Sequence, residues 1–234
     1  MWFLESLDKV NQAIQGTNDL EQMMSDVLQA TLTVFGCDRA WLVFPCEPDT
    51  PAWRVMMEQT RPEYAALAEG DHTTCAGSAE VFRHARDNPG VAGYGAGFSM
   101  PVPTDLAEQF SVRGLLCTAL QPKVGTRYVF GLHQCQPDTP WSAKAEQLFR
   151  EIGRRLADAI STLWTFRSLR ESEARLEAAQ RQARLGYWSL DIESDVTTWS
   201  EETYRIFGLV PQDEPSLLAD ASIVHPGDLA RVVE

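Results

Sequence analysis

The chain has 234 residues, of which 44% are hydrophobic, and a formal net charge of -13 at pH 7. This length allows one well-buried core and part of a second. The negative charge argues against a nucleic acid as partner, because binding to phosphates requires a basic surface. Five cysteines without regular spacing do not indicate a disulfide framework.

The N-terminal sequence MWFLESLDKVNQAIQ has acidic residues beside its hydrophobic ones. It has neither the basic region and uninterrupted apolar run of a signal peptide nor the composition of a membrane span. We therefore expect a cytoplasmic protein with reduced thiols and no membrane partner.

Two amphipathic helices are predicted at the start of the chain. The first ends at Gly16 and carries on one face Phe3, Leu7, Val10 and Ile14. The second has a broad apolar face between Leu20 and Phe35 and stops at Gly36. Asn18 is its predicted N-cap, with Glu21 three residues later.

Four short apolar runs bounded by turn residues predict strands, at 39–44, 53–58, 115–121 and 128–134. The first two suit a hairpin, and Lys123–Gly125 forms the turn between the last two. Helices are predicted around 78–86 and near 104–110. The glycine-rich stretch GVAGYGAG between them lacks the strand and helix that flank a dinucleotide fingerprint, so we interpret it as a mobile flap.

A long helix is predicted over residues 142–183. Its first half has one buried face, with Leu148, Ile152, Leu156, Ile160 and Leu163. Leu156 and Leu163 are seven residues apart, as are Leu169, Leu176 and Ala183, which predicts the seam of a two-stranded coiled coil with one skip. Acid-before-base pairs one turn apart support the helix: Glu151 with Arg155, Glu171 with Arg175 and Glu177 with Arg181. The alternative is a surface helix of a single domain, against which its uncapped length argues.

After the helix, Trp188, Leu190 and Ile192 alternate with polar residues, and a second run follows from Val196 to Trp199. This pattern predicts a hairpin that turns at residues 193–195. Ser200 is the predicted cap of a short helix that Gly208 ends.

The order of these elements predicts an α+β fold in which an antiparallel sheet carries helices packed on one face. The segments TNDLEQMMSDVLQATLTVFGCDRAWLVF and RYVFGLHQCQPDTPWSAKAEQLFREIGRRLADAIS resemble the opening of a GAF domain and its closing strand with the exit helix. The resemblance covers roughly residues 15–165.

A GAF-like sheet leaves a cavity beneath the insertion, and small-molecule sites of this kind are concave and mostly apolar. By analogy with the family, the ligand-binding residues are Tyr94, Phe98, Cys117 and His133. The alternative is that these four residues only fill the core. No cysteine is followed by histidine as in bilin-carrying GAF domains, and the cyclic-nucleotide signature of the family is absent, so the cofactor is unknown.

The motifs GYW, TWSEE, YRIFGL and VHPGD resemble the start of a PAS domain, with Val224–Asp228 where that family shows HPxD. Fewer residues follow Arg184 than such a domain needs, and its later strands are missing. The segment is therefore either part of a longer protein or not independently stable. We divide the chain into a GAF-like sensory domain with its N-terminal helix (1–165), a coiled-coil linker (166–183) and an incomplete PAS segment (184–234).

No catalytic or metal-binding set is predicted. His72 with Cys75 and His133 with Cys135 are pairs that zinc accepts, but their spacings are not those of zinc ribbons or fingers. We interpret His133 and Cys135 as ordinary sheet residues.

These features predict a regulatory input module of a bacterial signal-transduction protein. Its signal passes through a homodimeric helix, with a seam at Leu156, Leu163, Leu169 and Leu176, to an output domain of the same longer chain. The resemblance implies a sensor histidine kinase, or less often a diguanylate cyclase, and no catalysis within this chain. A ligand-free dimerisation module is the alternative. A methionine sulfoxide reductase using Cys46, Cys75, Cys117 and Cys135 is disfavoured, because those enzymes are stand-alone domains.

Overall fold

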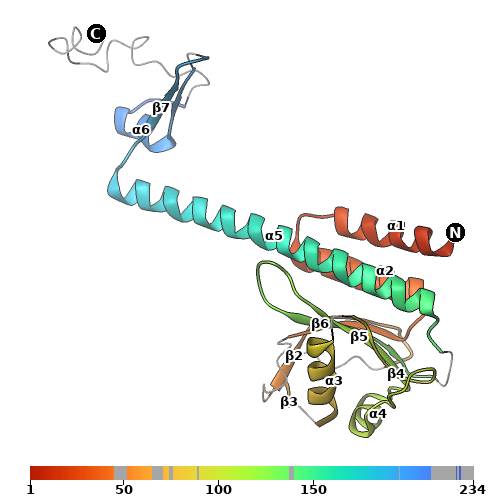
Figure 1. Cartoon of the computed structure of the whole chain (residues 1–234). Coiled ribbons are helices and arrows are strands. Elements are labelled where there is room, and N and C mark those ends of the chain that lie inside the picture. Colours follow the sequence, from red (N-terminus) through yellow and green to blue (C-terminus); the bar gives the residue numbers. More distant parts are fainter. Residues whose placement is uncertain are drawn as a thin grey trace. The chain divides into compact units, whose positions relative to one another are not determined.

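The computed structural model describes residues 1–44, 52–64, 71–73, 76–88, 90–136, 140–194, 196–211, 225 and 227. The chain divides into two compact units, Met1–Phe166 and Arg167–Glu234 (Figure 1). Among the described residues, no helix has both the length and the apolar character that a membrane crossing requires.

The first unit contains a six-stranded sheet in the order β3-β2-β1-β6-β5-β4, and every neighbouring pair is antiparallel. The strands are β1 Arg39–Phe44, β2 Ala52–Thr60, β3 Asp71–Thr73, β4 Ala92–Gly95, β5 Gly114–Leu120 and β6 Tyr128–Gln134. The predicted α+β class and antiparallel sheet are confirmed. The predicted bounds of β1 and β6 match the structure to the residue.

Helices cover both faces of this sheet. On one side lie α1 (Trp2–Gln15), α2 (Leu20–Phe35) and the first half of α5 (Ala143–Ala183), and on the other lie α3 (Ala76–Asp87) and α4 (Thr104–Phe110) (Figure 1). The first layer is the one that the element order predicted, and the two insertion helices add the second. The N-cap of α2 is Asp19 and not the predicted Asn18, because the Asp19 side chain accepts a hydrogen bond from the backbone nitrogen of Gln22.

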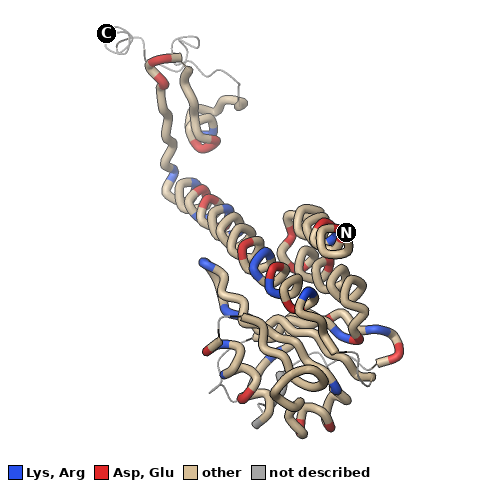
Figure 2. The backbone as a smooth tube through the Cα atoms, turned by 45° about the vertical axis from the view of Figure 1, so that its right-hand side comes forward, with Lys and Arg blue, Asp and Glu red and all other residues tan. Residues whose placement is uncertain are grey.

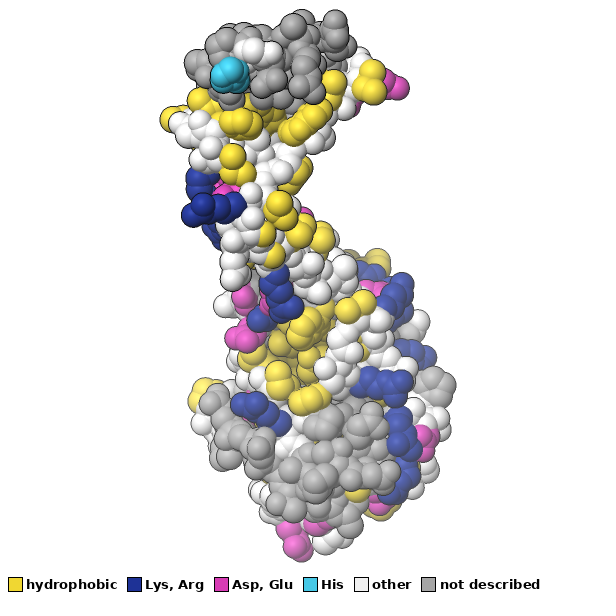
Figure 3. Space-filling view, turned by 90° about the vertical axis from the view of Figure 1, so that its left-hand side faces the viewer, with side chains coloured by type: hydrophobic (Ala, Val, Ile, Leu, Met, Phe, Trp, Pro, Cys, Tyr) yellow, Lys and Arg dark blue, Asp and Glu magenta, His cyan; other side chains and the backbone are white. Residues whose placement is uncertain are grey.

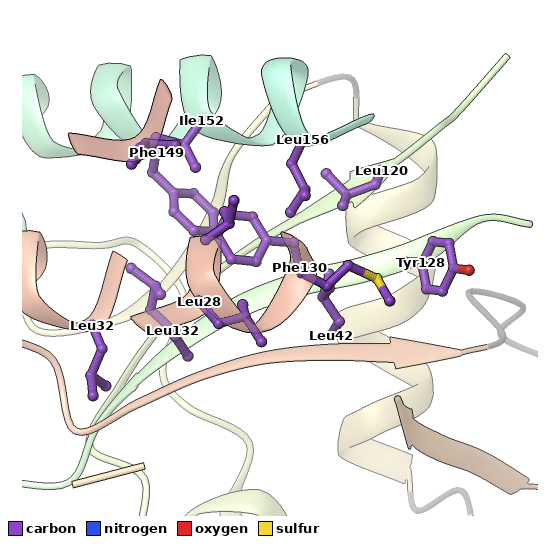
Figure 4. Packing of buried hydrophobic residues seen from close by; sticks show 14 of the residues in the cluster. Leu28, Leu32, Leu42, Leu120, Tyr128, Phe130, Leu132, Phe149, Ile152 and Leu156 are labelled. Carbon is purple, nitrogen blue, oxygen red and sulfur yellow. The ribbon is translucent and has the colours of Figure 1, made fainter. Parts of the chain in front are cut away.

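The larger core lies between the sheet and the layer of α1, α2 and α5. Figure 4 shows side chains of alternate strand residues meeting those of the helices, among them Leu42, Leu132, Phe130, Leu28, Phe149 and Ile152. The rings of Phe130 and Phe149 stack with their centroids 4.6 Å apart. Each such side chain contributes about 1.5–3 kcal/mol by leaving water, so this layer provides much of the stability of the unit.

Leu156 belongs to this core, contrary to its predicted place in a dimer seam. It is 0% exposed and continues the buried face of α5 that begins with Leu148 and Ile152. Leu163 is partly buried against the same core. Leu156 therefore has no free surface for a second copy.

The second core lies between the other face of the sheet and α3 and α4. It contains Trp41 and Val43 of β1, Leu115 and Cys117 of β5, and Val81, Phe82 and Leu106 of the two helices. The strand residues alternate with those of the first core, as the period of two of a strand requires. Both faces of β1 and β5 are therefore buried.

The predicted mobile flap contains an edge strand, so that prediction was wrong. β4 pairs with β5 from Ala92 opposite Cys117 to Gly95 opposite Gly114. A side chain on Gly93 would collide with the ring of Phe98, and Gly95 has a φ of 99°. These glycines permit close approach and a left-handed backbone, and the segment is ordered by its pairing.

α5 is a single helix of 41 residues, as predicted. It begins after Ser142, whose Oγ accepts a hydrogen bond from the backbone nitrogen of Ala145 at 3.1 Å. Acidic and basic residues alternate along it (Figure 2). Leu169 and Leu176 in its second half are 55% and 61% exposed.

The second unit contains the predicted hairpin and short helix. β7 (Trp188–Asp191) pairs antiparallel with β8 (Val196–Trp199), and α6 spans Glu201–Phe207. The Ser200 side chain accepts a hydrogen bond from the backbone nitrogen of Thr203, and Gly208 ends the helix with a φ of 71°. Most of Val224–Asp228 lies outside the described residues.

Candidate functional site

A small cavity lies on the face of the sheet that α3 and α4 cover. Its volume is about 30 Å³. Aromatic rings make up much of its wall, from Trp41 on β1, Trp53 on β2, Phe82 on α3 and Phe110 on α4, and His133 of β6 and Ser78 of α3 add polar groups. A space of this size holds about one water molecule.

Strand register places the indole of Trp41 in this cavity. Trp41 lies opposite Gly131 of β6 on the same face of the sheet. A side chain at Gly131 would collide with the Trp41 ring, so the glycine makes room for the indole to cross β6. The ring then reaches His133, with the two ring centroids 5.1 Å apart.

Two polar atoms of this pair are buried without a hydrogen-bond partner among the described residues, namely Trp41 Nε1 and His133 Nδ1. An unsatisfied buried polar group costs about 1–3 kcal/mol. Burial, with the nearby Arg39 charge, lowers the pKa of His133 to about 3, so its imidazole is neutral at physiological pH. The uncharged imidazole of His133 and the indole of Trp41 therefore lie beside the cavity with one unsatisfied nitrogen each.

Arg39 links the C-terminal end of α4 to the sheet by hydrogen bonding, beside this cavity. Its Nη1 donates a hydrogen bond to the carbonyl oxygen of Phe110 at 2.8 Å and another to Cys135 Sγ at 3.3 Å. Arg39 Nε lies 3.8 Å from Glu58 Oε1, and both side chains are buried. Because Phe110 forms part of the wall, the hydrogen bond from Arg39 helps to hold that part of the wall against the sheet.

The structure brings three of the four predicted ligand-binding residues to one face of the sheet. His133 lines the cavity, while Tyr94 and Cys117 are buried in the surrounding core. The Tyr94 hydroxyl lies 3.0 Å from His84 Nδ1, and burial raises the pKa of Tyr94. Ligand binding by these residues stays a prediction.

Phe98 lies elsewhere. Its ring lies where a side chain on Gly93 would lie. Because successive strand residues point to opposite faces of the sheet, this is the face opposite to that of the Tyr94 side chain. Phe98 packs against the core of α1, α2 and α5, so it does not share the cavity with His133. The prediction for Phe98 is corrected in this respect.

Trp41, Trp53 and Phe82 were missed as cavity residues. Each occupies a core-facing position of its strand or helix, which the apolar pattern does reveal. The cavity itself arises from the contact between Trp41 and Gly131, two residues far apart in the sequence.

Burial raises the pKa of two described thiols, those of Cys37 and Cys135. Cys37 is fully buried, and burial, with the charge of Asp38, raises its pKa to about 12. Burial also raises the pKa of Cys135. Because the thiolate is the reactive form, neither residue supports the reductase hypothesis, and Cys46 and Cys75 lie outside the described residues.

Cys135 and His133 make no metal site with a third ligand. The part of the chain that the structure describes contains no group of three or more His, Cys, Asp or Glu side chains able to hold a metal ion. The side chain of His72 and the whole of Cys75 lie outside the described parts, so that predicted pair has no structural description.

One hairpin connects the cavity wall to α5. β5 and β6 contribute Leu115 and His133 to the cavity. At the turn between these strands, the backbone nitrogen of Lys123 donates a hydrogen bond to Ser161 Oγ at 2.8 Å. Gly125, with a φ of 100°, lies against the ring of Trp164. A displacement of this hairpin would therefore act on α5.

No protein-family model matches the sequence, and a search of curated protein sequences finds no match. Solved structures do match. A protein in its far-red absorbing dark state with bound biliverdin IXa is 16% identical, with a TM-score of 0.55, and the match covers 68% of this chain and 98% of that one.

The phycoerythrobilin-bound GAF domain of a cyanobacterial phytochrome is 12% identical, with a TM-score of 0.55 and coverage of 71% and 98%. The PixJ GAF domain of Thermosynechococcus elongatus, in its blue-light absorbing form, is 12% identical, with a TM-score of 0.53 and coverage of 66% and 92%. At such identities the likeness is one of fold. The first unit has a GAF-like fold.

The bilins bound in the first two of these structures do not fit the cavity of this one. The volume of about 30 Å³ is far below what a tetrapyrrole fills. The described residues that line it include neither a cysteine for a covalent bond nor a charged side chain for a propionate.

Proposed function

We propose that this chain is the sensory input part of a bacterial signal-transduction protein, in the simplest case a cytoplasmic sensor histidine kinase. Its GAF-like unit binds a small uncharged molecule on the face of the sheet that α3 and α4 cover. The observation that carries this proposal is the buried pair of unsatisfied polar atoms, Trp41 Nε1 and His133 Nδ1, on residues that line a cavity with aromatic walls.

The signal passes from this cavity to α5 through the hairpin of β5 and β6. A ligand that prefers one position of His133 and Leu115 shifts the turn that holds Ser161 and Trp164. Such a ligand changes the balance of two states only by its differential affinity for them, typically worth about 1–3 kcal/mol.

We further propose that the second half of α5 pairs with that of a second copy. Leu169 and Leu176 are seven residues apart and more than half exposed, as the seam of a coiled coil requires before assembly. Figure 3 presents a surface on which hydrophobic side chains lie among charged ones. Leu156 and Leu163 pack in or against the core of the first unit. The proposed contact between the two copies is therefore made by Leu169 and Leu176.

The residues after α5 are proposed to be the beginning of a PAS domain that leads to an output domain of a longer protein. Exposed hydrophobic side chains on the hairpin, among them Trp188, Leu190 and Ile192, support this proposal, because further elements of a complete domain would cover them. The catalytic step is placed in that output domain, a histidine kinase or, as the alternative, a diguanylate cyclase.

The second candidate is a dimerisation module without a ligand. The small volume of the cavity favours it, because about one water molecule could satisfy both Trp41 Nε1 and His133 Nδ1. The two hypotheses therefore differ in one respect. The sensor hypothesis requires a molecule larger than water to bind between α3 and the sheet, and the dimerisation hypothesis does not.

A thermal-shift screen with small uncharged compounds, nucleotides and tetrapyrroles separates the two. The sensor hypothesis expects a reproducible rise in Tm from one uncharged class, and loss of that rise in Val81→Phe, which fills the cavity from α3. Val124→Phe, at an exposed turn position, is the matched control and should keep the rise. A screen without any shift, or a shift that survives Val81→Phe, contradicts the proposed site and favours the dimerisation module.

A further inference from the structure

The two helices over the cavity are joined at one point and form a single cover. The backbone nitrogen of Gly77, in the first turn of α3, donates a hydrogen bond to the Asp105 carboxylate of α4 at 2.9 Å. A side chain on Gly77 would overlap Asp105 and Pro103, so the helices are in close contact there. N–H groups in the first turn of a helix have no partner within it, and Asp105 supplies one. The cover therefore consists of both α3 and α4.

The cover buries fewer large side chains than the helices on the other face of the sheet. Its contribution to the second core consists of Val81, Phe82, Ala85 and Leu106. On the opposite face, α5 by itself buries Leu148, Phe149, Ile152, Leu156 and Ile160. Each large apolar side chain contributes about 1.5–3 kcal/mol by leaving water. The cover is therefore the layer that separates from the sheet at the lower free energy.

Each helix of the cover is fastened to the sheet by a hydrogen bond, and the two bonds differ in strength. At the end of α4, the Arg39 guanidinium donates to the Phe110 carbonyl oxygen at 2.8 Å and lies buried beside Glu58. Near the end of α3, His84 Nδ1 lies 3.0 Å from the Tyr94 hydroxyl of β4. A hydrogen bond to a charged group contributes about 1.5–3 kcal/mol, and an ordinary one about 0.5–1.5 kcal/mol. The bond of α3 is the weaker one.

Hydration makes the same end easier to open. His84 is half-buried, so water can replace the Tyr94 hydroxyl as its partner. The Tyr94 residue is 1% exposed, and its hydroxyl reaches water once α3 moves away. Separation at Phe110 would instead leave the charged Arg39 donor in a buried position. The cover should therefore part from the sheet first at His84.

We propose that α3 and α4 form a hinged lid over the cavity. The bond between His84 and Tyr94 is its latch, and the bond between Arg39 and Phe110 is its pivot. The lid opens and closes in the folded protein without unfolding of the layer formed by α1, α2 and α5.

Opening of the lid enlarges the cavity. It moves Phe82 away from Trp53, whose ring centroid lies 6.2 Å from that of Phe82 in the closed state. The closed cavity of about 30 Å³ holds about one water molecule, so a larger molecule enters only when its wall moves. This role in ligand entry rests on the function proposed above, whereas the opening itself does not depend on a ligand.

Two buried cysteines distinguish opening of the lid from unfolding. Cys117 of β5 is 0% exposed and lies in the core that the lid shields. Cys37 is also 0% exposed, but it lies in the core on the other face of the sheet. A thiol reagent therefore reaches Cys117 when the lid opens and Cys37 when the other layer unfolds.

Alkylation of the full chain with iodoacetamide, followed at each cysteine by mass spectrometry of tryptic peptides, tests the proposal. His84→Ala removes the latch and should speed modification of Cys117 at least about fivefold, which corresponds to about 1 kcal/mol in the opening equilibrium. The rate at Cys37 should stay unchanged. Arg83→Ala, at the adjacent exposed position of α3, is the matched control and should change neither rate.

A second variant tests the latch from its other side. Tyr94→Phe keeps the buried ring and removes the hydroxyl, so it should also speed modification of Cys117, and combining it with His84→Ala should add nothing, because both remove one bond. An unchanged Cys117 rate in both single variants, or a parallel rise at Cys37, overturns the lid. Because these measurements use no ligand, a thermal-shift screen without any response would contradict the proposed binding site and leave the lid intact.

Discussion

α5 has the same helical conformation along its length, but its two halves differ in what they contact. In the first half, Ile152, Leu156 and Ile160 are fully buried against the sheet. In the second half, Leu169 and Leu176 are more than half exposed. Apolar residues of one helix therefore serve two purposes: they stabilise the GAF-like unit in the first half and leave an available surface in the second.

The boundary between the halves is marked by the turn of β5 and β6. Ser161 accepts its hydrogen bond there, and Trp164 packs against Gly125 one turn later. Beyond these contacts the side chains of α5 up to Ala179 are exposed. The proposed signal enters the helix at the point where its burial ends.

The largest expected effect comes from truncating the buried half. Leu156→Ala should lower the free energy of unfolding by about 2–5 kcal/mol, because it leaves a cavity between α5 and the sheet. Leu176→Ala, the same change in the exposed half, should lower it by less than about 0.5 kcal/mol in the monomer. Urea unfolding followed by circular dichroism at low protein concentration measures both. Equal losses would show that the two halves are not distinct.

Association should depend on the exposed half instead. Leu176→Glu places an unpaired charge in the proposed seam and should weaken the dimer by about 2.8 kcal/mol, which is roughly a hundredfold in the dissociation constant. Sedimentation equilibrium measures this change. Ala174→Glu adds the same charge at an exposed position on the opposite side of the helix, and it should change dimerisation little because that position lies off the seam. A dimer of unchanged affinity in Leu176→Glu would place the contact elsewhere.

The boundary itself should show an intermediate effect. Gly125 has a φ of 100°, and a side chain there would come within 3.0 Å of Trp164 Cδ1. Gly125→Ala should therefore lower the free energy of unfolding by about 1–3 kcal/mol, measured by urea unfolding. Gly90→Ala is the matched control, since nothing lies within 4 Å of an added side chain and no positive φ opposes it. If both variants were equally stable, the turn would not be fixed against α5.

Sequence patterns were sufficient for the elements that are defined locally. β1 and β6 are apolar runs bounded by turn residues, and their predicted bounds match the structure. β4 was missed because its glycines have low strand propensity, so that it exists through its pairing with β5. The heptad spacing of Leu156 and Leu163 could not reveal their partner, because a buried face and a coiled-coil seam share that spacing.

The candidate site was predictable only in part. His133 was identified through resemblance to the GAF family, and the structure places it on the cavity wall. Trp41 was not identified, because its place in the cavity wall depends on the pairing of β1 with β6, which sets it opposite Gly131. Phe98 lies after the end of β4, and its ring covers the face of the sheet opposite to Tyr94. The alternation of residues along β4 could not predict this position, because Phe98 is not part of the strand.

The smallest expected effect is electrostatic and again distinguishes the halves of α5. A hydrogen bond from Arg154, together with one from Arg155, lowers the pKa of Glu151 to about 2. Because the pKa is lower in the folded state than its ordinary value of 4.5, this contribution is fully present above pH 4.5. It is lost as the pH falls from there toward 2.

Glu151→Gln should therefore lower the free energy of unfolding at pH 7 by less than about 1 kcal/mol, since the pair is partly screened by solvent, and by almost nothing at pH 2. Glu171→Gln removes the corresponding pair in the exposed half, where Arg167 lies 3.1 Å away, and should have the smaller effect of the two. Urea unfolding of both variants between pH 2 and 7 measures the difference. A loss for Glu151→Gln that stayed constant over this range would mean that the carboxylate contributes through packing, not through its charge.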